Sequence, residues 1–188
     1  MPNSYSSLCD SFSLEMYVNT ELDLPSERET VLSFFERIQK QFPEMDNFYR
    51  RSLGDFCLED IRNDSRYRWV TLELDRIWVG CCDPENIEDA YSLQQAVLEL
   101  EPYMLGVSRL DISSMDVTFT MDLDYQGNHD EIIAEALLND SPFGNFLGIP
   151  GAKSIGCCPN MVFGLSEDMR TQAKIAVESK TSFYDFRT

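Results

Sequence analysis

The sequence contains only one histidine, His129, and none of its six cysteines belongs to a C-x-x-C pair. A single histidine excludes metal sites built from several imidazoles, and vicinal cysteines do not present two thiolates to one zinc ion. The chain also lacks an apolar run long enough to cross a bilayer, and its first residues do not resemble a signal peptide. We therefore expect a cytoplasmic protein with no metal and no cofactor.

The cysteines are Cys9, Cys57 and two vicinal pairs, Cys81-Cys82 and Cys157-Cys158. In a cytoplasmic chain they are expected to be reduced. Adjacent residues of an extended chain point to opposite faces, so one member of each pair is expected in the core. A cysteine–histidine dyad with His129 stays open as an alternative, but a surface position for His129 at the start of a helix is the interpretation we favour.

Basic residues are also scarce, since 15 Lys and Arg stand against 33 Asp and Glu and leave a net charge of −18. A surface this acidic repels nucleic acids and anionic membranes, so we expect neither as a partner. It favours cationic ligands and basic proteins. General solubility is the simpler interpretation of the same charge.

Two segments share one pattern of apolar and polar residues. Residues 13–32 align without a gap on residues 114–133, with Glu15 falling on Asp116 and Glu21 on Asp122. Further on, residues 59–62 match 167–170 and residues 70–73 match 175–178, which equates Glu73 with Glu178. Three matches in the same order predict an internal duplication.

The first copy predicts a half-buried strand with Leu14, Met16, Val18 and Leu22 facing inward. A helix is expected to follow from Ser26, which forms a capping box with Glu29. Its apolar stripe consists of Val31, Phe34, Phe35 and Ile38, and Phe42-Pro43 ends it. Two strands are then expected, near 54–61 and 66–79.

The second copy predicts a helix that Asn128 caps. The residues expected on its buried face are Ile132, Ile133, Ala136 and Leu137. Strands are expected near 160–166 and 171–184. Between the copies, Asp83-Pro84 is expected to start a helix over about 84–101.

These elements predict an α+β fold in one domain over residues 1–188, with repeats at 13–80 and 114–185. The expected sheet is mostly antiparallel, with helices on one face. The first six elements match a ferredoxin-like βαββαβ layout, and the alternative is two βαββ modules joined by a helix. Duplicated βαββ modules are similar in topology to gyrase-inhibitor-like and SOUL-type ligand-binding proteins, a resemblance that implies a ligand held between the repeats.

The face of the sheet turned away from the helices is the expected site. Its candidate residues are Glu15, Tyr17, Asn19, Trp69, Thr71, Glu73, Asp116, Thr118, Thr120 and Glu178. Aromatic rings beside carboxylates suit a small cationic or aromatic ligand, whereas a solvated sheet face is the bland alternative.

Three functions follow from this pattern. The first is a non-enzymatic binding protein for such a ligand. The second is an acidic interaction or inhibitor module that masks a basic protein surface. An enzyme that uses buried carboxylates comes third. A last strand ending at 186–188 with a free edge would allow pairing into a homodimer.

Overall fold

The computed structural model describes residue 5 and residues 7–51, 54–61 and 66–180. The chain divides into two compact units, Met1–Leu123 and Asp124–Thr188, which are described separately. The single domain expected over residues 1–188 stays a prediction.

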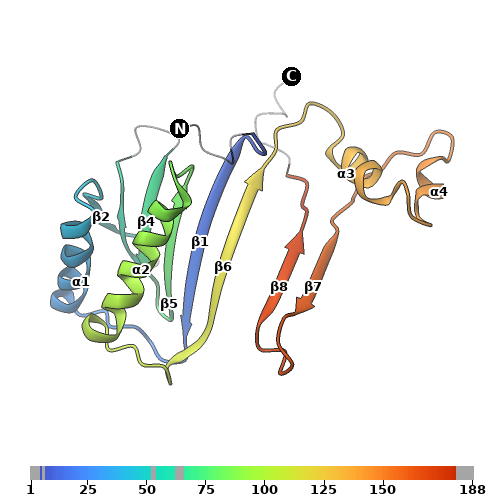
Figure 1. Cartoon of the computed structure of the whole chain (residues 1–188). Coiled ribbons are helices and arrows are strands. Elements are labelled where there is room, and N and C mark those ends of the chain that lie inside the picture. Colours follow the sequence, from blue (N-terminus) through green and yellow to red (C-terminus); the bar gives the residue numbers. More distant parts are fainter. Residues whose placement is uncertain (1–4, 6, 52–53, 62–65, 181–188) are drawn as a thin grey trace. The chain divides into compact units, whose positions relative to one another are not determined.

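The first unit is a six-stranded sheet with two helices. Every neighbouring pair of strands is antiparallel, in the order β2-β3-β4-β5-β1-β6. Its strands are β1 (Ser11–Thr20), β2 (Asn47–Arg50), β3 (Phe56–Glu59), β4 (Tyr67–Leu72), β5 (Arg76–Cys82) and β6 (Ile112–Asp122). The helices α1 (Arg28–Gln41) and α2 (Ile87–Met104) pack on one face (Figure 1). The expected antiparallel α+β arrangement is confirmed.

The core lies between this face and the two helices. Leu14, Met16 and Val18 alternate along β1 with half-buried polar residues and are at most 2% exposed. The four residues of the expected α1 stripe are all buried, and the helix ends at Phe42 as predicted. Leu22 is 66% exposed because β1 ends at Thr20, so its inward assignment was wrong.

Both helix starts expected in the first unit were wrong. Helix α1 begins at Arg28 after Glu27, without a side-chain cap, so Ser26 forms no capping box there. Helix α2 begins at Ile87 after Asn86, because Asp83 serves β1 instead. The Asp83 carboxylate accepts the Phe12 backbone N–H at 2.8 Å and the Ser11 hydroxyl at 3.2 Å. Helix α2 also continues through Pro102 to Met104.

The expected strand over 66–79 is two strands, β4 and β5. The turn between them is closed by the Glu73 N–H, which donates to the Arg76 carbonyl at 2.9 Å. Four strands therefore separate α1 from α2, and the described order is not ferredoxin-like. The duplication stays a prediction.

The second unit contains α3 (His129–Leu138), α4 (Gly144–Leu147) and an antiparallel hairpin of β7 (Asn160–Gly164) and β8 (Gln172–Ala176). The predicted cap is confirmed, since Asn128 Oδ1 accepts the Glu131 N–H at 3.3 Å. The strand expected over 171–184 is shorter, since β8 ends at Ala176 and residues 177–180 are not strand. The rest of that expected strand, with its end at 186–188, lies outside the described residues.

The buried face predicted for α3 was wrong, because Ala134 is its buried residue and Ile132 and Leu137 are 40% and 52% exposed. The side of α3 that carries Asp130 faces the rest of the second unit. The Oδ1 atom of Asp130 accepts the Cys157 N–H and the Ser179 hydroxyl, both at 2.9 Å. Ala134 follows one turn later on the same side and is buried.

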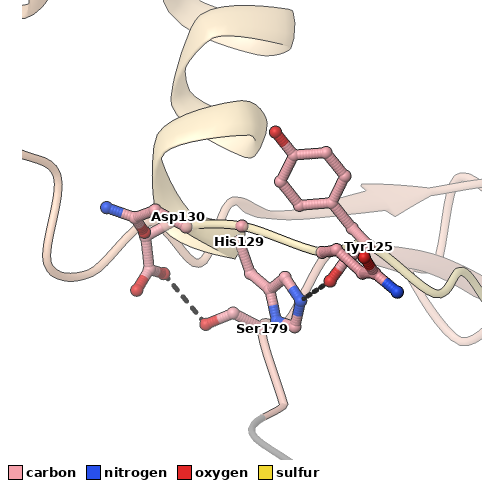
Figure 2. Close-up of a pocket in the computed structure, with 7 residues that line it drawn as sticks. Tyr125, His129, Asp130 and Ser179 are labelled. Atoms are coloured by element: carbon pink, nitrogen blue, oxygen red, sulfur yellow. Dashed lines mark hydrogen bonds between the residues drawn. The ribbon is translucent and has the colours of Figure 1, made fainter.

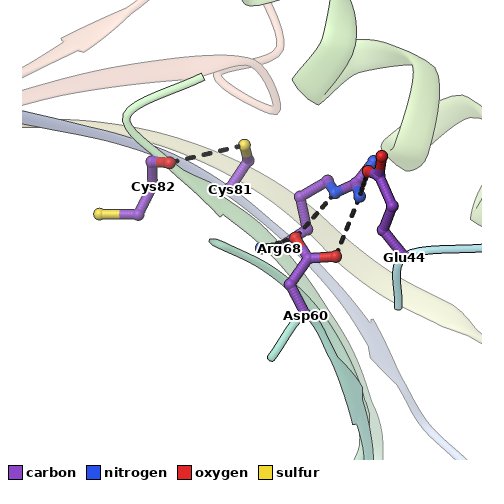
Figure 3. Close-up of polar contacts among 5 residues, drawn as sticks. All are labelled: Glu44, Asp60, Arg68, Cys81 and Cys82. Carbon is purple, nitrogen blue, oxygen red and sulfur yellow. Dashed lines mark hydrogen bonds and ion pairs between the residues drawn. The ribbon is translucent and has the colours of Figure 1, made fainter. Parts of the chain in front are cut away.

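An ion-pair cluster joins three segments of the first unit (Figure 3). Arg68 donates to both carboxylate oxygens of Asp60 at 2.9 Å and to Glu44 at 2.8 Å. Neighbouring Cys81 is buried, and burial raises the pKa of its thiol to about 12. Cys81 is therefore a protonated structural thiol at neutral pH.

All six cysteines are free thiols, and one member of each vicinal pair is buried, as predicted: Cys81 and Cys157. No helix within the described residues is long and apolar enough to span a membrane.

Glu101 of α2 makes stability depend on pH. Its side chain is 4% exposed and its Oε2 has no hydrogen-bond partner. Burial raises the pKa of Glu101 from 4.5 to about 7, so the folded state keeps a proton that the unfolded state releases between these values. Its contribution to stability is complete below pH 4.5 and is lost as the pH rises to about 7.

We expect Glu101→Gln to be more stable than the wild type above pH 7, by at most about 3 kcal/mol, and to show no such gain below pH 4.5. Denaturant titrations across this range measure the difference. The exposed Glu99 supplies the control, Glu99→Gln, whose difference from the wild type should stay flat. An equally flat difference for Glu101→Gln would contradict the buried carboxylate.

Candidate functional site

The face of the sheet opposite α1 and α2 carries an aromatic cluster, which we define as Tyr17, Tyr67, Trp69 and Trp78. The strand register brings these side chains together, because Tyr17 of β1 lies opposite Trp78 of β5, and Trp78 lies opposite Thr71 of β4. The Tyr17 and Trp78 rings stack with centroids 5.9 Å apart. The rings of Trp69 and Trp78 meet edge to face at 5.5 Å, and Tyr67 lies 5.0 Å from Trp69. Distances of this kind are typical of favourable aromatic pairs.

Gly80 makes room for the centre of this cluster. In the register it lies between Trp69 of β4 and Glu15 of β1. A Cβ atom at Gly80 would lie 2.0 Å from Cζ2 of the Trp69 ring, so the indole rests directly on the glycine backbone. A glycine inside a strand often marks such a close approach. Trp69 is consequently only 5% exposed although α1 and α2 pack on the opposite face.

Both indole nitrogens of the cluster lack a hydrogen-bond partner. The Nε1 atoms of Trp69 and Trp78 are shielded from solvent and donate to nothing. A buried donor without an acceptor costs about 1–3 kcal/mol, and buried Trp N–H groups usually find a partner. The cluster therefore has unused capacity to donate hydrogen bonds.

The carboxylates of the same face are, in contrast, already paired. Glu15 accepts the Tyr17 hydroxyl, and Glu73 accepts the Arg76 guanidinium. Asp116 accepts the Asn19 amide at 2.9 Å. Burial, helped by the bond to Glu15, raises the pKa of the Tyr17 hydroxyl well above its usual range. The phenol therefore stays a donor at neutral pH.

A second row of polar contacts lies toward β3. Glu59 is 6% exposed and accepts the Asn47 amide at 3.2 Å and the Tyr49 hydroxyl at 3.1 Å. Thr71 is fully buried and donates to the Cys57 sulfur at 3.5 Å. Two guanidinium groups lie over rings of the cluster, Arg51 over Trp78 at 5.6 Å and Arg76 over Tyr17 at 5.5 Å.

The structure brings most of the expected site residues together. Glu15, Tyr17, Asn19, Trp69, Thr71, Asp116, Thr118 and Thr120 lie on this face, and Glu73 follows β4. Glu178 belongs to the second unit and is not placed beside them. Sequence reasoning missed Trp78, Gly80, Glu59 and Arg51. The glycine inside an apolar strand, close to Trp78, was the available signal.

His129 lines an open hollow of the second unit (Figure 2). The hollow is formed by residues 125–130 with Ser179, and no cysteine lines it. The Nε2–H of His129 donates to the Tyr125 carbonyl at 2.7 Å. The imidazole is thus bonded to a backbone oxygen, and a cysteine–histidine dyad gains no support. The described residues include no group of three metal-binding side chains.

Comparisons of the chain with protein-family models, with curated proteins and with solved structures find no match. The function of the protein is therefore inferred from the geometry of the aromatic cluster.

The contact between Trp69 and Gly80 predicts the effect of adding one methyl group. Gly80→Ala should displace the Trp69 indole, lower the free energy of unfolding by about 1–3 kcal/mol and shift the tryptophan emission. Gly156→Ala is the matched control, because a Cβ atom there meets nothing within 4 Å and its φ is not positive. Denaturant titration with fluorescence detection measures both effects. Equal stability of the two variants would contradict the packing described.

Proposed function

We propose that the protein is a non-enzymatic binding protein that holds a small, flat aromatic molecule on the aromatic cluster. The observation that carries this proposal is the pair of unpartnered indole N–H groups on Trp69 and Trp78. Aromatic walls with a few fixed polar groups are the usual lining of small-molecule sites. Tyr17 and Trp78 are half-buried and leave ring surface for a ligand to cover.

The cationic alternative has weaker support. Glu73 is neutralised by Arg76, and Glu15 and Asp116, which keep their negative charge, already accept a hydrogen bond from Tyr17 and Asn19. An enzymatic role also has weaker support at this face. The buried carboxylate with a raised pKa is Glu101, which lies on α2 and so belongs to the other side of the sheet.

A panel of flat aromatic compounds that are neutral, anionic and cationic tests the proposal. The chain contains two tryptophans, both in the cluster, so quenching of the intrinsic fluorescence reports on this site. We expect compounds that raise the Tm of the wild type to bind Trp78→Ala at least about tenfold more weakly.

Tyr103→Ala is the control, since Tyr103 is an aromatic residue of α2 that is 88% exposed. It should bind as the wild type does. The proposal fails if no compound of the panel binds, or if binders do not distinguish Trp78→Ala from Tyr103→Ala.

A second candidate function, an acidic protein-interaction module, has its own supporting observation. Within the described residues β6 pairs on one side only, with β1. Its side chains on the helix-bearing face form an apolar stripe that is 43–55% exposed, made of Met115, Val117, Phe119 and Met121. A free strand edge with an apolar stripe suits the addition of an extended peptide. The charge of −18 favours a basic one.

A synthetic peptide of alternating lysine and valine tests this second function. We expect it to bind the wild type with an affinity that falls as salt rises. Val117→Lys should weaken binding more than Thr118→Lys, because both add one charge but only Val117 belongs to the apolar stripe. Isothermal titration measures the affinities. Equal weakening by both variants, or no binding, would contradict strand addition at β6.

A further inference from the structure

The unsatisfied polar atoms of the aromatic cluster define the chemistry of its ligand. We propose, on the basis of the proposed function, that the aromatic ligand carries a carbonyl or carboxylate oxygen and that this oxygen accepts hydrogen bonds from Trp69 Nε1 and Trp78 Nε1. The structure offers donors at this position and keeps its acceptors occupied.

The indole ring can donate a hydrogen bond through its nitrogen but cannot accept one there. An ammonium group, which has no lone pair, therefore cannot satisfy this N–H. The Nε1 atoms of Trp69 and Trp78 belong to rings whose centroids are 5.5 Å apart and whose planes cross at 76°. A carbonyl or carboxylate oxygen supplies the lone pairs that these donors need.

The carboxylates around the cluster already accept hydrogen bonds. Glu59 receives two hydrogen bonds, from Asn47 and Tyr49, and Glu15 receives the Tyr17 hydroxyl. The carboxylate of Glu73 is neutralised by Arg76. A donor-bearing ligand would share these oxygens with the partners already bound to them, whereas the two indole N–H groups have no partner to share.

Two guanidinium groups lie over rings of the cluster. The Arg51 guanidinium lies 5.6 Å from the centroid of the Trp78 ring, and Arg76 lies 5.5 Å from that of Tyr17. Arg76 is paired with Glu73, so Arg51 is the cation that acts on a ligand beside Trp78. Its charge favours a ligand oxygen that carries partial or full negative charge.

Access to the donors requires a small movement. Both nitrogens are shielded in this structure, and the Trp78 and Tyr17 rings are only half-buried. In the proposed complex the Trp78 or Tyr17 ring rotates from the position described, so that the ligand oxygen reaches the shielded nitrogens. The bond to the ligand oxygen then offsets the cost of leaving the donor unpaired in the free protein.

Four naphthalenes of matched size test the proposal with the full-length protein: acetylnaphthalene, naphthoate, ethylnaphthalene and naphthylmethylammonium. The readout is the pair of indole N–H signals in a ¹H–¹⁵N correlation spectrum, since the chain contains only these two tryptophans. Acetylnaphthalene and naphthoate should move the indole protons downfield. They should bind about tenfold or more tightly than ethylnaphthalene, with the ammonium compound weakest.

Trp78→Phe keeps a ring and removes one donor, so it should abolish most of the preference for acetylnaphthalene over ethylnaphthalene. Binding of ethylnaphthalene or the ammonium compound as tightly as acetylnaphthalene would overturn the inference while leaving the proposed function standing. Failure of all four compounds to bind would count against the proposed function itself. Indole signals that already contact an ordered water and do not move when naphthoate binds would also overturn the inference, because water would then fill the role.

Discussion

The contact between the Trp69 indole and the backbone of Gly80 organises the face of the sheet opposite α1 and α2. A side chain at position 80 would occupy the space of the ring, since its Cβ atom would lie 2.0 Å from it. With glycine there, Trp69 lies across the neighbouring strand and becomes 5% exposed. Trp78 then meets its edge and Tyr17 stacks on Trp78, so the whole cluster depends on the absence of one methyl group.

The net charge of the chain and the hydrogen bonds at the aromatic cluster favour different ligands. The chain has a net charge of −18, which favours cationic partners in general. At the aromatic cluster, however, each carboxylate that sequence analysis singled out on the first-unit face accepts a hydrogen bond from a neighbouring side chain. The groups left without a partner are two indole donors. The proposed ligand therefore uses two donors of the protein, whereas the net charge by itself would favour a cation.

Periodicity predicted the parts of the fold that depend on local pattern. The alternation of Leu14, Met16 and Val18 and the stripe of α1 are both buried as expected. Sequence analysis failed where a tertiary contact competes with a local signal: the Asp83 carboxylate bonds to β1 instead of capping α2, and Asp130 turns α3 toward its own loop. Sequence analysis identified only part of the candidate face. A single strand over 66–79 puts Trp69 and Trp78 on opposite faces, whereas the turn after Leu72 returns Trp78 to the same face. Glu178 was assigned by the alignment, and the structure places it in the second unit.

Contacts between specific protons test the central claim most directly, because it concerns where one ring lies in the free protein. In a nuclear Overhauser spectrum of the unliganded full-length chain, the Trp69 ring protons should show strong contacts with the Gly80 Hα protons and with the Trp78 ring. Both indole N–H protons should exchange slowly with solvent, since both nitrogens are shielded. A Trp69 ring without contacts to Gly80, with an indole proton that exchanges rapidly, would contradict the account.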